Sequence, residues 1–256
     1  MKNVIVTGAS RGFGHAIARR MLDKGYRVYG LSRTVPADLV DEAEFRYVPV
    51  DLSQTRMASA VLSDYFLREQ RVSDVAYLFL NAGMFGDRVM RVSDIAMDEM
   101  KQIVDLNVWA NKLLLDLFLR GGVPIATCVA SASMAGVRAR AGNGGYAISK
   151  ATLNMMLKLY ALEHPATFFA VLGLCSLNTR LFDHTLYPPA DPNQFPDIAV
   201  LQKRAQLPGY LTTPEQRAQD VDQVLNGPLR EQLVSGEFVD MRSLLASAAA
   251  SVTVAA

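Results

Sequence analysis

Short apolar runs alternate with longer helical stretches along most of this 256-residue chain. Runs rich in branched and aromatic residues predict six β-strands, at residues 3–6, 27–31, 45–50, 75–80, 125–130 and 168–172. Several of these runs are apolar at consecutive positions, which indicates that both faces of the strands are buried. The alternation predicts an α/β fold, namely a doubly wound parallel sheet of about seven strands with helices on both faces.

No repeat or linker interrupts this pattern, so we expect a single domain over residues 1–245. Within it, residues 180–213 lose the periodicity and carry prolines and scattered aromatic side chains. A long irregular stretch inside a compact domain is typical of a lid or binding loop, so we expect a substrate loop here. Thr213 and Pro214 then predict a helix start, as its cap and first-turn residue. Residues 246–256 form a tail of small residues, a loose end or a packed edge.

One helix, expected at about residues 98–120, has two apolar faces. The first face carries Met100, Val104, Leu114 and Phe118, and the second carries Leu106, Trp109, Leu113 and Leu117. One face is enough to cover the sheet. A contact between subunits and a helix wedged into the core of a monomer explain the second face equally well.

Composition and charge exclude several classes of protein. Hydrophobic residues make up 50% of the chain and charged residues 20%, which indicates a globular rather than a disordered protein. The formal net charge is +1, so no general electrostatic field attracts nucleic acid or an anionic membrane. Any bound anion must therefore be held by local groups.

The cysteines and the apolar runs indicate a cytoplasmic protein. Cys128 and Cys175 lie in apolar segments without CxxC spacing, as reduced thiols do. The first strand and a glycine turn follow so soon after Met1 that we expect no secretion signal, and no apolar run is long enough to span a membrane. The three histidines have no companions at metal-ligand spacing, so we expect no metal.

The sequence TGASRGFG, at residues 7–14, lies between the first strand and the helical run 15–24. In such a turn Gly8 permits the bend, Gly12 lets a backbone approach a pyrophosphate, and Gly14 lets helix and strand close together. The helix N-terminus favours the negative charge. Because the spacing differs from GxGxxG, a tight connection that binds nothing is the alternative interpretation.

This turn resembles the cofactor signature TGxxxGxG of the short-chain dehydrogenases/reductases, which it matches in full. LNAG at residues 80–83 and VDLS at residues 50–53 extend the resemblance, which covers roughly residues 1–179. It implies a Rossmann-type fold that binds a nicotinamide dinucleotide. The cofactor-binding residues that it implies are Gly8, Ser10, Arg11, Gly12, Phe13, Gly14, Ser32, Arg33, Asp51, Leu52, Asn81, Ala82, Gly83, Tyr146, Lys150, Leu177 and Thr179.

The end of the second strand predicts which nicotinamide cofactor is bound. Members of the family that prefer NAD carry an acidic residue where this chain has Ser32. Arg33 follows it and Arg11 lies in the glycine turn, so two guanidinium groups are positioned to meet the 2′-phosphate of NADP. We therefore expect NADP(H) to be preferred over NAD(H).

Four polar residues resemble the catalytic tetrad of the family in order and spacing. Tyr146 and Lys150 are four residues apart, on one face of a helix. Ser133 is preferred to Ser131 because it precedes a glycine by three residues and the tyrosine by thirteen. Asn107 completes the set, although an amide that bonds to its own helix backbone is the alternative for it.

The resemblance implies an oxidoreductase that interconverts a carbonyl compound and a secondary alcohol, with Tyr146 as general acid or base. A free phenol has a pKa of about 10, and we expect the ammonium group of Lys150 to lower the pKa of Tyr146. Ser133 is expected to hydrogen-bond the carbonyl oxygen. Asn107 is expected to hold a water that passes protons from Lys150 to bulk solvent.

The chain departs from the family after the sixth strand, where Leu174 and Cys175 replace Pro-Gly although Thr179 is kept. The loss of the conformational freedom of glycine bears on the geometry of this loop. A catalytically silent sensor that binds NADP(H) is the alternative function. Members that have lost catalysis generally lack the tyrosine or the lysine, and both are present here.

The expected partners are small molecules and other copies of the chain. Aromatic and proline residues between positions 180 and 210 favour a carbonyl or alcohol substrate with apolar surface. The resemblance implies a homodimer or homotetramer, in which the helices around Leu113 and residues 153–159 form a four-helix contact.

Overall fold

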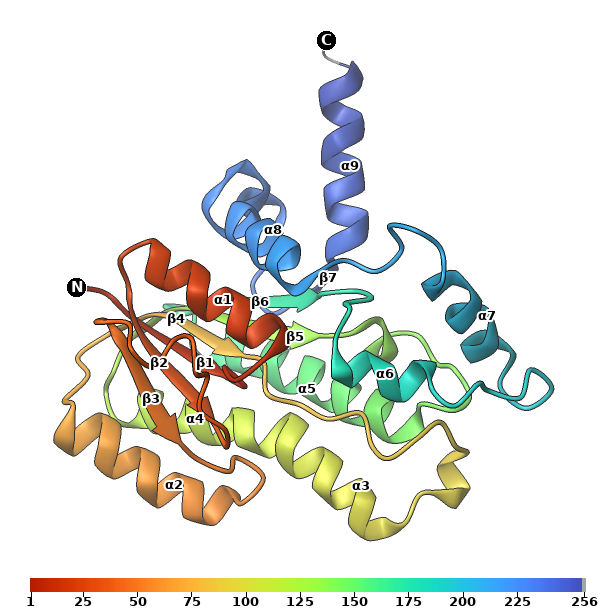
Figure 1. The fold of residues 1–256 in the computed structure, drawn as a ribbon. Helices are drawn as coiled ribbons and strands as arrows, with labels where there is room; N and C mark the ends of the chain where they lie inside the picture. The colour runs from red at the N-terminus through yellow and green to blue at the C-terminus, as the bar shows by residue number, and fades with distance from the viewer. Residues whose placement is uncertain (255–256) are drawn as a thin grey trace.

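The computed structural model describes the backbone of residues 1–254 and the side chains of residues 1–249. Its centre is a seven-stranded sheet in the order β3-β2-β1-β4-β5-β6-β7, in which every neighbouring pair is parallel (Figure 1). The strands are β1 (Asn3–Thr7), β2 (Arg27–Ser32), β3 (Phe45–Pro49), β4 (Val75–Leu80), β5 (Ile125–Ala132), β6 (Phe168–Gly173) and β7 (Phe238–Asp240). The predicted doubly wound parallel sheet is confirmed.

Helices cover both faces of the sheet (Figure 1). One face packs against α1 (Gly12–Asp23) and α8 (Pro214–Asn226), and the other against α2 (Thr55–Ser63), α4 (Ala110–Arg120) and α5 (Gly144–Glu163). All five residues of β1 are buried, as expected for a strand covered on both sides. The carboxyl ends of the strands therefore meet at one open edge, where a ligand binds in folds of this kind.

The long apolar helix is interrupted by one turn of π-helix. Its first part is α3 (Met97–Val104), the π-helical turn η3 is Asp105–Trp109, and α4 continues to Arg120. Leu114 and Phe118 of the first apolar face are fully buried. On the second face Trp109 is 45% exposed, and Leu106, Leu113 and Leu117 are only partly buried. The core of the monomer therefore does not enclose this second face.

Residues 180–213 contain two helices, α6 (Arg180–Leu186) and α7 (Pro196–Ala205), so the expectation of an irregular stretch is wrong there. Both helices are too short for an apolar period to stand out in the sequence. Tertiary burial stabilises α7, because Phe195 before it and Ile198 within it are buried. The predicted start of α8 is confirmed, since the hydroxyl of Thr213 accepts from the N–H of Gln216 at 3.2 Å.

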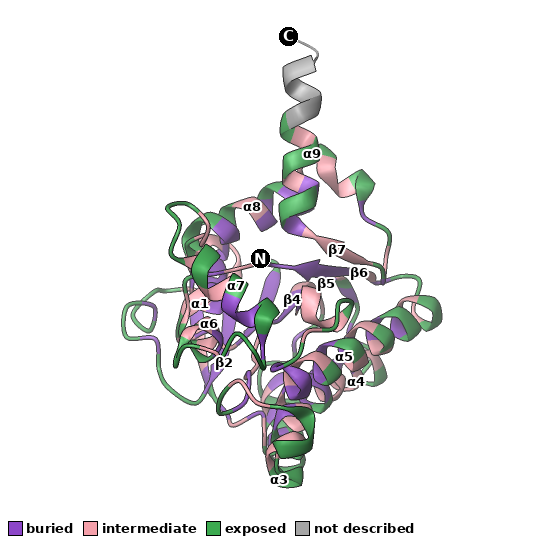
Figure 2. Cartoon of the chain, turned by 90° about the vertical axis from the view of Figure 1, so that its right-hand side faces the viewer, coloured by how far each residue is buried: buried purple, intermediate pink, exposed green. Residues whose placement is uncertain are grey.

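The chain ends in α9 (Met241–Val254), which stands away from the body of the protein (Figures 1 and 2). Met241 and Leu244 at its base are buried. The expected loose end or packed edge at residues 246–256 is helical as far as Val254, and the last two residues lie outside the described part. Among the described residues, no helix is both long and apolar enough to cross a membrane.

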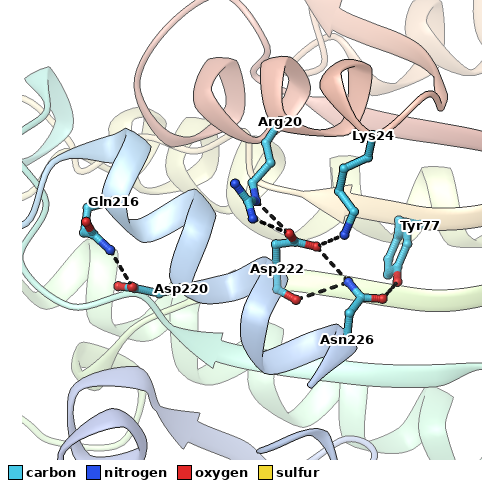
Figure 3. A network of polar contacts seen from close by, with 7 residues as sticks. All are labelled: Arg20, Lys24, Tyr77, Gln216, Asp220, Asp222 and Asn226. Carbon is cyan, nitrogen blue, oxygen red and sulfur yellow. Dashed lines mark hydrogen bonds and ion pairs between the residues drawn. The ribbon is translucent and has the colours of Figure 1, made fainter. Parts of the chain in front are cut away.

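A network of polar side chains fastens α1 to α8 (Figure 3). The carboxylate of Asp222, 5% exposed, accepts from Arg20 Nε at 2.7 Å and from Lys24 of α1. It also accepts from Asn226, which in turn accepts from the hydroxyl of Tyr77 at 2.8 Å. Burial alone would raise the pKa of Asp222, but its hydrogen bonds to Lys24 and Arg20 hold the pKa below the usual value. The far end of α1 is therefore anchored to α8.

Candidate active site

The glycine turn forms a cradle at the carboxyl end of β1. Gly8 and Gly12 have φ angles of +70° and +60°, in the left-handed region that favours glycine. At Gly14 a Cβ atom would lie 2.3 Å from the carbonyl oxygen of Gly8 and 2.5 Å from Asn81 Nδ2. A side chain at Gly14 would clash with the turn and push α1 away from it, and α1 begins at Gly12 with its N-terminus at the turn. The cradle therefore fits a dinucleotide pyrophosphate.

The ends of β1 and β4 are joined by side-chain hydrogen bonds. The hydroxyl of Thr7 donates to the carbonyl of Phe79 at 3.2 Å and accepts from the N–H groups of Asn81 and Ala82 at 2.8 and 2.9 Å. Asn81 Nδ2 donates to the carbonyl of Thr7 at 3.2 Å. The LNAG segment is thus fixed directly beside the glycine turn.

The residues predicted to select the cofactor lie at the end of β2 and in the glycine turn. Ser32 is 7% exposed, whereas Arg33 and Arg11 are both exposed. Two acidic residues of the loop after β2 have other partners, since Asp38 pairs with His15 and Glu42 pairs with Arg19. Both arginines are therefore open to an anionic ligand.

Other predicted cofactor residues follow the same edge of the sheet. The carboxylate of Asp51 accepts from the N–H and the hydroxyl of Ser53 at 3.0 and 2.7 Å, which folds it onto its own turn. Phe13 and Leu52 are buried, so their side chains support the site from the core. The remaining members are half-buried, namely Ser10, Ala82 and Gly83.

The loop after β6 reaches the glycine turn. A Cβ atom on Gly12 would lie 3.4 Å from the methyl group of Thr179, and Leu177 in the same loop is buried. Cys175 has a φ of +64°, so the chain keeps here a backbone conformation that favours glycine. Its thiol lies 3.4 Å from the carbonyl of Gly173 and 3.4 Å from Oδ1 of Asp240.

Three of the four predicted catalytic residues lie side by side. The hydroxyl of Tyr146 is hydrogen-bonded to Ser133, which is the N-cap of a short 3-10 helix after β5. Lys150 Nζ lies 5.5 Å from the centre of the Tyr146 ring. It donates to the carbonyl of Ser131 at 2.7 Å. Serine, phenol and ammonium groups therefore occupy one corner of the site.

Burial sets the pKa values of this corner. It raises the pKa of Tyr146 to about 12, against the opposing effect of the hydrogen bond with Ser133. It lowers the pKa of Lys150 to about 8. The expectation that Lys150 lowers the pKa of Tyr146 is therefore wrong, because the loss of solvation dominates and the effect that opposes it is the hydrogen bond with Ser133. At neutral pH the phenol holds its proton.

Asn107 lies in the π-helical turn η3 and clamps the loop after β4. Its Oδ1 accepts from the N–H of Met84 at 2.8 Å, and its Nδ2 donates to the carbonyl of Met84 at 2.9 Å. The same Nδ2 donates to the hydroxyl of Ser149 at 2.9 Å. The alternative of an amide bonded to its own helix backbone is wrong. Both N–H groups are engaged, and the predicted role with water stays a prediction.

One aromatic side chain packs against Tyr146, and a second packs against the loop that precedes α5. Phe85, 6% exposed, lies with its ring centre 5.5 Å from that of Tyr146. Phe195, before α7, packs against Gly142, where a Cβ atom would lie 2.9 Å from the Phe195 ring. The segment at residues 180–205 therefore contacts a loop beside the catalytic corner.

Two residues of this corner were missed by the sequence analysis. Ser131 was set aside in favour of Ser133, yet its carbonyl holds Lys150 and its hydroxyl donates to Asn81 Oδ1 at 3.0 Å. The signal was its place at the end of a predicted strand, two residues before Ser133. Phe85 follows the LNAG segment closely, but no pattern distinguished it from a core aromatic.

The fold and this corner together define the class of protein. A parallel sheet with a glycine cradle after β1 and a Ser-Tyr-Lys group beside it is the arrangement of a dinucleotide-dependent oxidoreductase. The chain belongs to the short chain dehydrogenase family, whose model matches residues 2–180. It is an NAD(P)-dependent oxidoreductase that acts on an alcohol or a carbonyl group.

Known relatives are similar over part of their length. The chain is 30% identical over 169 residues to a benzil reductase ((S)-benzoin forming) of Bacillus subtilis, a match that covers 64% of this chain and 68% of the relative. It is 29% identical over 157 residues to a 1-deoxy-11-beta-hydroxypentalenate dehydrogenase of Streptomyces avermitilis, with 57% of each chain covered. A solved short-chain dehydrogenase of Streptomyces avermitilis has the same fold, with a TM-score of 0.74, 22% identity and coverage of 99% of this chain and 93% of the other.

Proposed function

We propose that this protein is an NADPH-dependent oxidoreductase that interconverts a carbonyl compound and a secondary alcohol, with Tyr146 as general acid and base. One observation carries the proposal. The hydroxyl of Tyr146 is bonded to Ser133 and lies beside the buried Lys150, at the same sheet edge as the glycine cradle. This is an acid, a hydrogen-bond donor and a cation around one place where an oxygen atom can be held.

The cradle and the strand ends would hold the cofactor. The glycine turn would take the pyrophosphate, and Thr179 lies beside Gly12 of that turn. The absence of an acid at Ser32 and the two exposed arginines, Arg11 and Arg33, support a 2′-phosphate, which a carboxylate would repel. Bound NADPH supplies the hydride that reduces the carbonyl carbon.

The side chains of the protein would supply the proton and stabilise the charge that develops. With a pKa of about 12, Tyr146 is protonated at neutral pH and gives its proton to the carbonyl oxygen. Ser133 hydrogen-bonds the same oxygen while charge develops on it. The positive charge of Lys150 favours the phenolate that remains. Asn107 holds the loop that carries Phe85 against the Tyr146 ring.

We propose a substrate with an apolar body. Phe85 offers apolar surface beside Tyr146, and the neighbours in sequence of Phe85 and Ser133, Met84 and Met134, are half-buried. The relatives named for benzil and for 1-deoxy-11-beta-hydroxypentalenate support this choice. Residues 180–213 would close over such a substrate.

We also propose a homodimer or homotetramer built on α4 and α5. Apolar side chains stand exposed along this face, namely Trp109 (45%), Ile148 (45%), Met155 (60%), Leu159 (49%) and Leu162 (74%). A second copy would cover them across a two-fold axis. The free thiols of Cys128 and Cys175 support a reducing compartment, for which we propose the cytoplasm.

A turnover assay tests the proposed function. The purified protein is mixed with NADPH or NADH and a panel of apolar ketones that includes benzil, and loss of reduced cofactor is followed by absorbance. We expect consumption of NADPH to exceed that of NADH. The opposite reaction is followed with NADP⁺ and the matching alcohols. If NADPH binds but is not oxidised with any ketone, and NADP⁺ is not reduced with any alcohol, the protein is a sensor and the proposal is contradicted.

A further inference from the structure

We propose that Ser131 is a positioning residue that links the phosphate cradle to the catalytic lysine. The inference rests on the proposed function, because it concerns the same cofactor site. Ser131 is the last residue but one of β5 and is half-buried. Its side chain acts on Asn81, and its backbone acts on Lys150.

The side chain of Ser131 begins a chain of bonds across three neighbouring strands. Its hydroxyl donates to Asn81 Oδ1 at 3.0 Å, at the end of β4. Asn81 Nδ2 donates to the carbonyl of Thr7 at 3.2 Å, at the end of β1. Since Thr7 is followed directly by Gly8, the path ends at the first glycine of the cradle.

The chemistry of the amide fixes its orientation. The carbonyl of Thr7 only accepts, so the NH₂ group of Asn81 must face it. The oxygen of the amide then faces Ser131, whose hydroxyl can donate to it. Without that hydroxyl, Asn81 Oδ1 loses the one side-chain donor that holds it. The amide is then free to turn or to draw in water.

A turned amide would disturb the cradle because it forms one of the cradle walls. A Cβ atom on Gly14 would lie 2.5 Å from Asn81 Nδ2, and one on Gly8 would lie 3.1 Å from it. The amide therefore touches two of the three glycines of the turn. A change in the position of the amide would therefore shift the glycine turn, which is the proposed site of the pyrophosphate.

The backbone of Ser131 meets a second need of the site. Lys150 is 4% exposed, and a buried ammonium group without an acceptor is costly. The carbonyl of Ser131 supplies that acceptor at 2.7 Å. One residue thus holds the lysine by its backbone and the cradle wall by its side chain. This bond to Lys150 survives the removal of the hydroxyl.

Ser133 provides a matched comparison. It lies two residues after Ser131 and just beyond the end of β5, with an extended backbone, and residues two apart in extended chain face the same side. Its hydroxyl bonds to Tyr146 instead of Asn81. Replacing either serine by alanine removes the same atom at nearly the same place, with opposite expected results for binding and turnover.

The test compares Ser131→Ala, Ser131→Thr and Ser133→Ala with the unaltered protein. The dissociation constant for NADPH is measured by fluorescence titration without substrate, and the thermal midpoint is measured without cofactor. Loss of one net hydrogen bond is expected to raise the dissociation constant about fivefold in Ser131→Ala. Ser131→Thr keeps the hydroxyl and should restore affinity. Ser133→Ala should lower turnover by about 10² or more with little change in affinity.

Two results would overturn the inference. One is an equal affinity for NADPH in Ser131→Ala and the unaltered protein. The other is equally weak binding in Ser131→Thr and Ser131→Ala at an unchanged thermal midpoint, because the hydroxyl would then have no part in it. Failure of the unaltered protein to bind NADPH at all would instead overturn the proposed function on which the inference rests.

Discussion

The thiol of Cys175 lies 3.4 Å from Oδ1 of Asp240. The backbone of Cys175 is in the left-handed region, with a φ of +64°. A side chain in that region costs about 1–2 kcal/mol relative to glycine. Between two variants that both lack the thiol, Cys175→Gly should therefore be more stable than Cys175→Ala by about 1 kcal/mol. Urea unfolding of the two proteins measures the difference, and equal free energies of unfolding would show that this backbone is not strained.

Arg33→Asp should move cofactor preference from NADPH towards NADH. A carboxylate beside Ser32 repels a 2′-phosphate and accepts from ribose hydroxyls instead. We expect the ratio of kcat/KM for NADPH to that for NADH to fall about tenfold or more, the effect of one charged hydrogen bond. Arg68→Asp is the control, because Arg68 is exposed and lies in the helical segment that leads to the amino end of β4, whereas Arg33 follows the carboxyl end of β2. A ratio equal to that of the control would assign the phosphate to Arg11 or another group.

Tyr146→Phe should abolish turnover while NADPH affinity is retained. The variant loses the proton donor, and general acid catalysis contributes about 10²–10⁴ in rate. The ring that packs against Phe85 remains. Lys150→Ala should weaken both binding and rate, so the pair separates chemistry from binding. Stopped-flow turnover with a parallel fluorescence titration decides the matter, and near-normal reduction by Tyr146→Phe would refute the mechanism.

The buried Lys150 should make stability depend on pH in the alkaline range. Its pKa falls from the ordinary 10.5 to about 8 on folding. Between these values the unfolded chain binds the proton more strongly, so stability rises with pH there. Lys150→Met removes this dependence. At pH 7 the variant should be the more stable protein, because it does not bury an ammonium group. We expect this difference in the free energy of unfolding to shrink by about 2 kcal/mol from pH 7 to pH 10. Urea unfolding at several pH values checks this, and parallel curves for the two proteins would contradict it.

Leu159→Glu should dissociate the proposed oligomer. The side chain is 49% exposed on α5, and a charge in the centre of an apolar contact is expensive to bury. Light scattering should report two or four times the 28.0 kDa chain mass for the unaltered protein and a lower mass for the variant. Val61→Glu is the control, since Val61 is also 49% exposed but lies on α2. A monomer before any substitution would refute the assembly.

Most of the sheet was predictable because its strands are buried on both faces and read as continuous apolar runs. β7 was not located, since Phe238–Asp240 is too short to produce a pattern and lies at the end of the sheet beside β6. The helices α6 and α7 were missed for the same reason of length. Their formation depends on contacts such as the burial of Phe195, which the local sequence does not encode.

The candidate site, like the fold, was only partly predictable from the sequence. Motif spacing was enough to pair Tyr146 with Lys150 and to choose Ser133 as the serine bonded to Tyr146. Motif spacing did not predict the partner of Asn107. That partner is the backbone of Met84, which lies in the loop after β4 and far from Asn107 in the sequence. Motif spacing also gave the wrong direction for the pKa of Tyr146. The spacing of residues in the sequence shows which charged groups can pair, whereas the loss of solvation depends on how far each side chain is buried in the folded protein.

The bonds that run from Thr7 through Asn81 and Ser131 to Lys150 have a consequence for the order of folding. Successive partners are 74, 50 and 19 residues apart in the chain, so each closes a loop of its own. β5 and α5 must be in place before Lys150 has its acceptor, and β1, β4 and β5 must be in place before the amide of Asn81 has both partners. During refolding from denaturant, the far-ultraviolet signal of helix and sheet should therefore return before the capacity to bind NADPH, with the catalytic corner assembled last.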